Sequence, residues 1–156
     1  IRGNVDTRLR KLKSGEYTGV LLAEAGLERL QLQSDVNYER LDCDPFVPAP
    51  NQGIIAVVAR KDSEESELLH RIEDVSTRIE ADVENEVLKV IGGGCAVPVG
   101  VHAHCVNGNS DIGLSIYIGY SGKRYILNKT VLPGEGHLEA ARKFAIELKN
   151  THKVCA

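Results

Sequence analysis

The most chemically distinctive stretch of the chain is Gly92-Gly93-Gly94-Cys95-Ala96-Val97-Pro98-Val99-Gly100. Three consecutive glycines allow backbone conformations that other residues avoid, and Pro98 restricts the backbone where the loop ends. A thiol in such a loop is a soft nucleophile with no bulky neighbour to shield it. Free cysteines are also common as small core residues. On this stretch alone, a buried thiol in a tight helix-to-strand turn is therefore an equal alternative.

The remaining cysteines and histidines show no metal-binding pattern. Cys43, Cys105 and Cys155 are scattered without a C-x-x-C pair, which argues against zinc and against a disulfide framework. His102 and His104 lie two residues apart on an expected strand, but no third ligand lies nearby in sequence. We expect no metal site, and we expect reduced cysteines, as in a cytoplasmic protein.

The composition limits the class of protein. The 156 residues have a formal net charge of −3, and no apolar run reaches membrane-spanning length. Neither a membrane nor a nucleic acid is therefore expected as a partner. The chain begins at Ile1 without a methionine, so a fragment, a processed product and a truncated chain are all open.

Helices are expected in the first half of the chain. Asn4 can cap a helix that ends at Gly15, and residues 24–32 predict a second helix. Asp62 and Glu65 have the spacing of a capping box ahead of a third helix.

Two short apolar runs, at 18–23 (TGVLLA) and 54–59 (IIAVVA), are typical of buried strands. Strands that alternate with helices predict α/β material. Two strands cannot form a self-sufficient parallel sheet, so their sheet partners are missing from residues 1–74. Three prolines and a glycine at 45–53 indicate a segment that crosses between units.

From about residue 75 onward, the pattern predicts a compact α+β unit. Ser76 can cap a helix that ends at the triple glycine. Apolar residues then alternate in three stretches, separated by turn sequences at 107–109 (NGN) and 121–122 (SG), which predicts three antiparallel strands. A last helix has the expected buried stripe Leu138, Ala141, Ala145 and Leu148.

Four stretches repeat, in order, the motifs of one family. They are IRGNVDTRL at 1–9, AGLERL at 25–30, PAPNQG at 48–53 and GGCAVPVG at 93–100. They are similar to the motifs RGN-x-x-TRL, AGL-x-RL, P-x-x-x-QG and GGC-x-VP-x-G of the porphobilinogen deaminase (hydroxymethylbilane synthase) family. One such motif is weak, whereas four in the right order are strong. The resemblance covers the later part of the family's chain.

The resemblance implies a fold of α/β plus α+β class. In the family, two α/β lobes resembling those of periplasmic binding proteins face a cleft, and a small domain with a three-stranded antiparallel sheet and helices follows. Residues 1–45 would be the end of the second lobe, and residues 46–74 would cross back to the first. Residues 75–156 would form the small domain, to which the cofactor is attached. The missing part would lie upstream of Ile1.

The resemblance also implies a reaction. The family joins four porphobilinogen molecules into hydroxymethylbilane and releases ammonia each time. A dipyrromethane primer is held by a thioether to the cysteine at the position of Cys95, next to Gly94. Loss of ammonia leaves a methylene-pyrrolenine, a soft electrophile that suits a thiolate. The primer would be the only cofactor.

Further ligand contacts follow from motif positions. Arg2, Arg8 and Arg29 match family arginines that bind acetate and propionate groups, because a guanidinium binds a carboxylate through two parallel hydrogen bonds. For a single arginine, a weak surface ion pair is the alternative. Gln52 is expected to shape a hinge or contact the ligand. The family's acid–base aspartate would lie upstream, so no catalytic residue is expected in this chain.

One departure concerns Asn85, which replaces a usual arginine, so a charged contact between domains would be lost. The chain alone is expected to be inactive and the complete enzyme to be a cytoplasmic monomer. A non-enzymatic module that binds a tetrapyrrole or carboxylate at Cys95 is the main alternative, and a redox thiol protein is a third.

Overall fold

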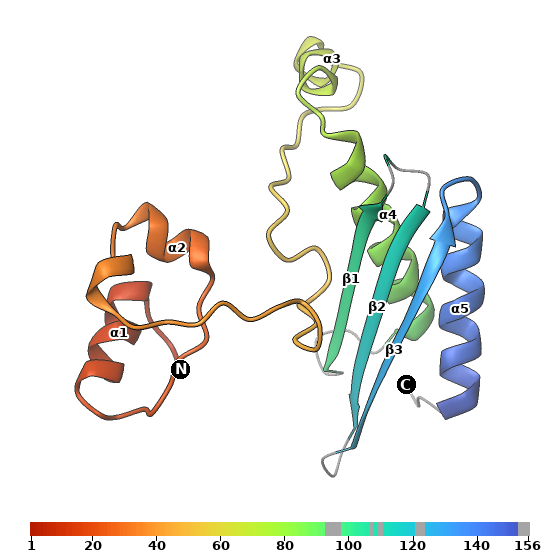
Figure 1. Ribbon diagram of the computed structural model, residues 1–156. Coiled ribbons are helices and arrows are strands. Elements are labelled where there is room, and N and C mark those ends of the chain that lie inside the picture. Colours follow the sequence, from red (N-terminus) through yellow and green to blue (C-terminus); the bar gives the residue numbers. More distant parts are fainter. Residues whose placement is uncertain (93–97, 107, 109–110, 121–123, 153–156) are drawn as a thin grey trace. The chain divides into compact units, whose positions relative to one another are not determined.

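The computed structural model describes residues 1–92, 98–106, 108, 111–120 and 124–152. The chain forms two compact units, Ile1–Leu41 and Asp42–Ala156 (Figure 1).

The first unit is helical. It contains α1 (Val5–Lys13), α2 (Glu24–Arg29) and a 3-10 turn, η1 (Gln33–Asp35). The predicted first helix is confirmed, and the chain leaves it at Gly15, where φ is 76°. Asn4 occupies the N-cap position, but its side chain makes no capping hydrogen bond, contrary to the prediction.

The two strands predicted in the first half of the chain are absent. Residues 18–23 and 54–59 have no regular structure, and Leu21, Ile55 and Val58 expose 72, 78 and 90% of their surface. A strand without a neighbour leaves its backbone donors and acceptors unpaired and its side chains in water. The α/β part of the predicted fold is therefore not seen in residues 1–74, which form helices and turns but no strand.

The cap of the third helix lies one residue after the predicted one. α3 (Glu64–His70) is capped by Ser63, whose Oγ accepts the backbone N–H of Ser66 at 3.3 Å. Asp62 instead has a left-handed backbone with φ of 61°. A residue in that conformation is not the extended N-cap that a capping box requires, so the prediction for Asp62 was wrong.

α4 (Val75–Ile91) is the long helix that leads to the glycine-rich loop. Its cap is Asp74, whose Oδ1 accepts the N–H of Thr77 at 2.7 Å, so the predicted cap at Ser76 was wrong. Ser76 lies inside the first turn. The helix ends at Gly92 with φ of 72°, as the glycines predicted.

The three predicted strands are confirmed as one antiparallel sheet. β1 (Val99–Val106), β2 (Asp111–Tyr120) and β3 (Arg124–Pro133) lie in the order β1-β2-β3. Val101 pairs with Ile116, and Ile116 pairs with Asn128. Of the two predicted turn sequences, residues 107, 109, 121 and 122 lie outside the described residues.

α4 and α5 (His137–His152) pack against the same face of this sheet (Figure 1). Three of the four predicted stripe residues of α5 are buried, but Leu138 in its first turn is 40% exposed, contrary to the prediction. Each large aliphatic side chain buried here contributes about 1.5–3 kcal/mol. The core consists of Val83, Val87, Ile91, Val101, Ala103, Ile112, Leu114, Ile116, Ile118, Leu132, Ala141, Ala145 and Leu148.

No helix in the described part of the chain is both long and apolar enough to cross a bilayer. The segment 42–53 precedes α3 and contacts the sheet and α4, as detailed below.

Candidate functional site

Residues 93–97, which include Gly94 and Cys95, lie outside the described residues. The residues on either side of them, Gly92 and Pro98, are both held by backbone hydrogen bonds. At the α4 end, the N–H of Gly92 donates to the carbonyl of Leu88 at 2.9 Å. At the β1 end, the carbonyl of Pro98 accepts the N–H of Gly119 at 2.8 Å. The backbone on both sides of the loop is therefore fixed by hydrogen bonds.

Two glycines permit close approaches next to this loop. A Cβ on Gly119 would lie 2.8 Å from Cγ of Pro98, and a Cβ on Gly100 would lie 2.6 Å from the carbonyl oxygen of Val47. Any larger residue at either position would push these neighbours away, because real Cβ contacts are longer. The exit of the loop is thus packed against both β2 and the segment that contains Val47.

An open groove of about 990 Å³ lies beside the two ends of the loop. Gly92, Pro98 and Val99 contribute the loop ends, and Ala49 and Pro50 contribute the PAPNQG stretch. The groove therefore brings the last two sequence motifs to one place. The other lining residues are Asp82, Asn85, Glu86, Leu88, Lys89 and Leu138.

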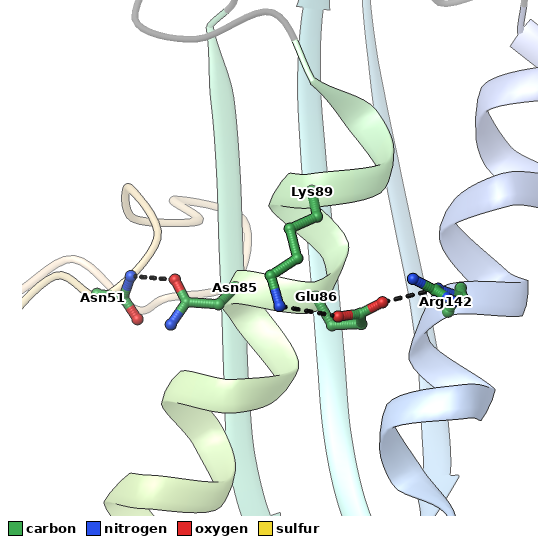
Figure 2. Close-up of polar contacts among 5 residues, drawn as sticks. All are labelled: Asn51, Asn85, Glu86, Lys89 and Arg142. Carbon is green, nitrogen blue, oxygen red and sulfur yellow. Dashed lines mark hydrogen bonds and ion pairs between the residues drawn. The ribbon is translucent and has the colours of Figure 1, made fainter.

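Two charged side chains of this wall, Glu86 and Lys89, are paired. Glu86 accepts hydrogen bonds from Nζ of Lys89 at 3.2 Å and from Nε of Arg142 at 2.8 Å (Figure 2). Lys89 and then Arg142 hold the pKa of Glu86 below its usual range, so this carboxylate remains ionised. The Glu86–Arg142 pair joins α4 to α5 beside the groove.

The key polar residue that sequence reasoning missed is Glu84. Its side chain is buried, with 5% of the residue exposed, and its two carboxylate oxygens accept the backbone N–H groups of Ala103 at 2.9 Å and Asn51 at 2.5 Å. Burial is the main cause that raises the pKa of Glu84. A glutamate directly after the buried Val83 was a signal that this carboxylate has a structural partner.

Asn85 also has a partner within the chain. Its Oδ1 accepts Nδ2 of Asn51 at 2.9 Å (Figure 2). Where an arginine was expected, an amide therefore contacts the PAPNQG stretch.

The three predicted arginines lie in the first unit. Arg8 is half-buried in α1, and its Nε donates to the carbonyl of Gly3 at 2.8 Å. Arg2 and Arg29 are exposed, and within the described residues neither forms an ion pair or a side-chain hydrogen bond.

The first two sequence motifs lie side by side in this unit. A Cβ on Gly26 of the AGL motif would lie 3.4 Å from Cγ2 of Val5 in α1. Gln52, in the second unit, is exposed at the end of a short turn. The described ligand candidates are thus divided between the two units.

His102 and His104 stack with ring centroids 5.6 Å apart. Among the described residues, no group of three or more potential metal ligands comes together. Sγ of Cys105 donates to the carbonyl of Ser76 at 3.7 Å, and burial raises the pKa of this thiol, which makes it a poor nucleophile.

Comparison with known proteins agrees with the motifs. The family model described as "Porphobilinogen deaminase, dipyromethane cofactor binding domain" matches residues 1–68, and "Porphobilinogen deaminase, C-terminal domain" matches residues 78–150. These matches define the class: a cofactor-binding domain followed by a distinct C-terminal domain. The chain belongs to the porphobilinogen deaminase family, which confirms the resemblance inferred from four motifs.

Curated relatives give the same result. A probable porphobilinogen deaminase of Methanocella arvoryzae is 45% identical over 95% of this chain and 48% of the relative. One of Methanosarcina acetivorans is 39% identical over 95% of the chain and 46% of the relative. One of Ignicoccus hospitalis is 54% identical over 66% of the chain and 33% of the relative. The chain spans about half the length of the first two relatives.

Proposed function

We propose that this chain is the later part of a hydroxymethylbilane synthase. The complete enzyme would join four porphobilinogen molecules head to tail. In each step the aminomethyl carbon of one porphobilinogen loses ammonia and forms a carbon–carbon bond to the pyrrole at the end of the growing chain. The observation that carries the proposal is the groove, which lies beside the Cys95 loop and is lined by the PAPNQG stretch.

We propose that Cys95 holds a dipyrromethane primer through a thioether. The residues around the loop fit such a group: the groove is open, and small or rigid residues, Gly92, Pro98 and Pro50, form its wall next to the loop. When bound, the primer supplies the pyrrole position to which the first substrate is joined. The thioether sulfur keeps the growing chain attached to the protein.

The arginines would bind the acidic side chains of the pyrroles. Arg2, Arg8 and Arg29 provide guanidinium groups in the two motifs that lie side by side in the first unit, and Gln52 provides an amide in the second. These residues bind and orient, whereas the acid–base aspartate would lie upstream of Ile1. The chain alone would therefore be inactive.

We assign residues 1–45 to the end of a second α/β lobe, 46–74 to a crossover into a first lobe, and 75–156 to the domain that holds the cofactor. The exposed apolar residues of the crossover support this assignment. Ile55, Val58, Leu68 and Ile72 are 78, 90, 57 and 74% exposed, and exposed apolar residues in such number are typical of a surface that is covered by a partner. The N-terminal lobe of the same enzyme would cover them, in a cytoplasmic monomer.

A fusion protein tests the function. In this fusion protein, the region of the Methanocella arvoryzae relative that lies before the part similar to this chain is joined to Ile1. The fusion protein is then supplied with porphobilinogen. We expect ammonia release, hydroxymethylbilane formation and the colour that an aldehyde reagent gives with dipyrromethanes.

A Cys95→Ser form of the fusion protein should lose the colour and the turnover, while a Cys43→Ser form, changed at an exposed free cysteine, should keep both. Colour without turnover would indicate a non-enzymatic pyrrole-binding module. A correctly folded wild-type fusion protein with neither colour nor turnover would contradict the proposal.

A further inference from the structure

The segment that leads to Gln52 is bound along the free edge of β1. The carbonyl of Pro48 accepts the N–H of Val101 at 3.0 Å, and the missing side chain of Gly100 leaves room for the carbonyl of Val47. Because β1 is an edge strand, its outward N–H groups need such partners. The chain is thus fixed on the sheet four residues before Gln52.

α4 provides a second attachment. One oxygen of Glu84 accepts the N–H of Ala103 in β1, and the other accepts the N–H of Asn51. A single buried carboxylate therefore joins α4, β1 and the segment.

The next residue of α4 binds the same asparagine. Oδ1 of Asn85 accepts Nδ2 of Asn51 (Figure 2), so Glu84 and Asn85 hold the backbone and the side chain of Asn51 together. Asn51 has a left-handed backbone with φ of 59°, a conformation that asparagine adopts more readily than most residues. This conformation turns the chain sharply at the point of attachment.

The attached turn presents Gln52 and forms part of the groove. The N–H of Gln52 donates to the carbonyl of Ala49 at 3.0 Å, and the side chain of Gln52 is exposed. Ala49 and Pro50, in the same turn, line the groove together with the loop end Pro98. After this turn, Ile55 is 78% exposed.

We propose that Glu84, Asn85 and Asn51 form a clasp that holds the turn from Ala49 to Gln52 at the wall of the groove, so that Glu84 and Asn85 are positioning residues for the ligand contact of Gln52. The ligand contact rests on the proposed function, whereas the clasp is a property of this chain alone. Two tests separate them.

The first test measures amide hydrogen exchange in the 156-residue chain. In Glu84→Gln, an amide N–H₂ replaces one acceptor oxygen, so exchange at Asn51 or Ala103 should become about tenfold faster. In Asn85→Ala, exchange at Gln52 should become faster while the β2–β3 pairs keep their protection. The matched control is Glu86→Gln, because Glu86 lies on the same helix and binds Lys89 and Arg142 instead.

Two results would overturn the clasp. Exchange at Asn51 and Gln52 that is unchanged in both variants would show that the hydrogen bonds do not hold the turn. Exchange that rises equally throughout β2 and β3 would show that the residues only stabilise the domain. If Glu84→Gln does not fold, Asn85→Ala, a change at a half-buried helical site, still decides the question.

The second test uses the fusion protein with Asn85→Ala. A displaced Gln52 should raise KM for porphobilinogen several-fold with a smaller change in kcat, and Glu139→Gln on the exposed side of α5 should change neither. An unchanged KM in an active fusion protein would refute the positioning role. An inactive wild-type fusion protein would refute the proposed function instead, and the exchange data would still decide whether the clasp exists.

Discussion

At the scale of single residues, the proposed chemistry depends on groups whose types were evident from sequence and on one that was not. The arginines and Cys95 stand in recognisable motifs, because a guanidinium for carboxylates and a thiolate for a soft carbon are the residue types such ligands require. Glu84 stands in no such motif. Its role became evident only when the fold brought Asn51 and Ala103 to its two oxygens.

Arg8 can be tested against a neighbouring cation. In the fusion protein, Arg8→Leu should weaken binding of the acidic pyrrole chain by roughly 1.5–3 kcal/mol, the usual range for a hydrogen bond to a charged group. Lys13→Leu, at an exposed position in the last turn of the same helix, should have little effect. Steady-state kinetics with porphobilinogen measures both, and equal activity of the two variants would refute the assignment of Arg8.

Glu84 should make stability depend on pH. Burial, helped by the nearby Glu80, raises its pKa in the folded chain, so the folded state binds this proton more tightly than the unfolded state does. This contribution to stability is full below the unfolded value of about 4.3, and it is lost as the pH rises through the folded value. Wild type should therefore lose stability relative to Glu84→Gln between pH 4.5 and 7.

Urea unfolding of both chains at these two pH values measures the difference. A difference in unfolding free energy that stays constant, or that favours wild type more at pH 7, would contradict the raised pKa.

At the scale of elements, the α+β unit could be predicted because its periodicities are local. Alternation gave the three strands, and the spacing of Val83 and Val87 gave the buried face of α4. The helix caps were harder to predict from sequence, because several polar residues stand near each helix start. Ser63 and Asp74 are the caps because each has an extended backbone directly before the first helical residue. Leu138 was misassigned because it lies at the groove rather than over the sheet.

The central strand should dominate the stability of this unit. Ile116 in β2 is 0% exposed, so Ile116→Ala should cost about 2–5 kcal/mol of unfolding free energy through lost burial and the cavity left behind. Val131→Ala on β3, where the side chain is 66% exposed, should cost about 0.5 kcal/mol or less. Urea unfolding compares the two, and similar costs would show that the core is not on the side of the sheet covered by α4 and α5.

At the scale of the whole molecule, sequence could predict the family and the helices of residues 1–74, but not that the two apolar runs there form no strand. The runs at 18–23 and 54–59 have the composition of buried strands, yet whether a strand forms depends on a neighbour that lies elsewhere. The sequence of such a run shows that it could form a strand, but it does not show with which strand the run would pair. Val58, 90% exposed, is the plainest sign of this dependence.

Residues 54–60 should therefore be poorly protected in the chain alone. Their amides should exchange rapidly and the chain should self-associate, because exposed apolar segments invite pairing with another chain. The strands β1 to β3 should be well protected in the same sample. Protection at Ile55 and Val57 should appear in the fusion protein, and strong protection across this segment in a monomer of the chain alone would show that it already has its partner.

The most direct measurement is the intact mass of the fusion protein after exposure to porphobilinogen, followed by peptide mapping. We expect the added mass of a dipyrromethane on the peptide that contains Cys95, and no such mass on a folded Cys95→Ala form. An adduct on Cys43, Cys105 or Cys155 instead, or no adduct on an active enzyme, would contradict the claim that Cys95 holds the primer.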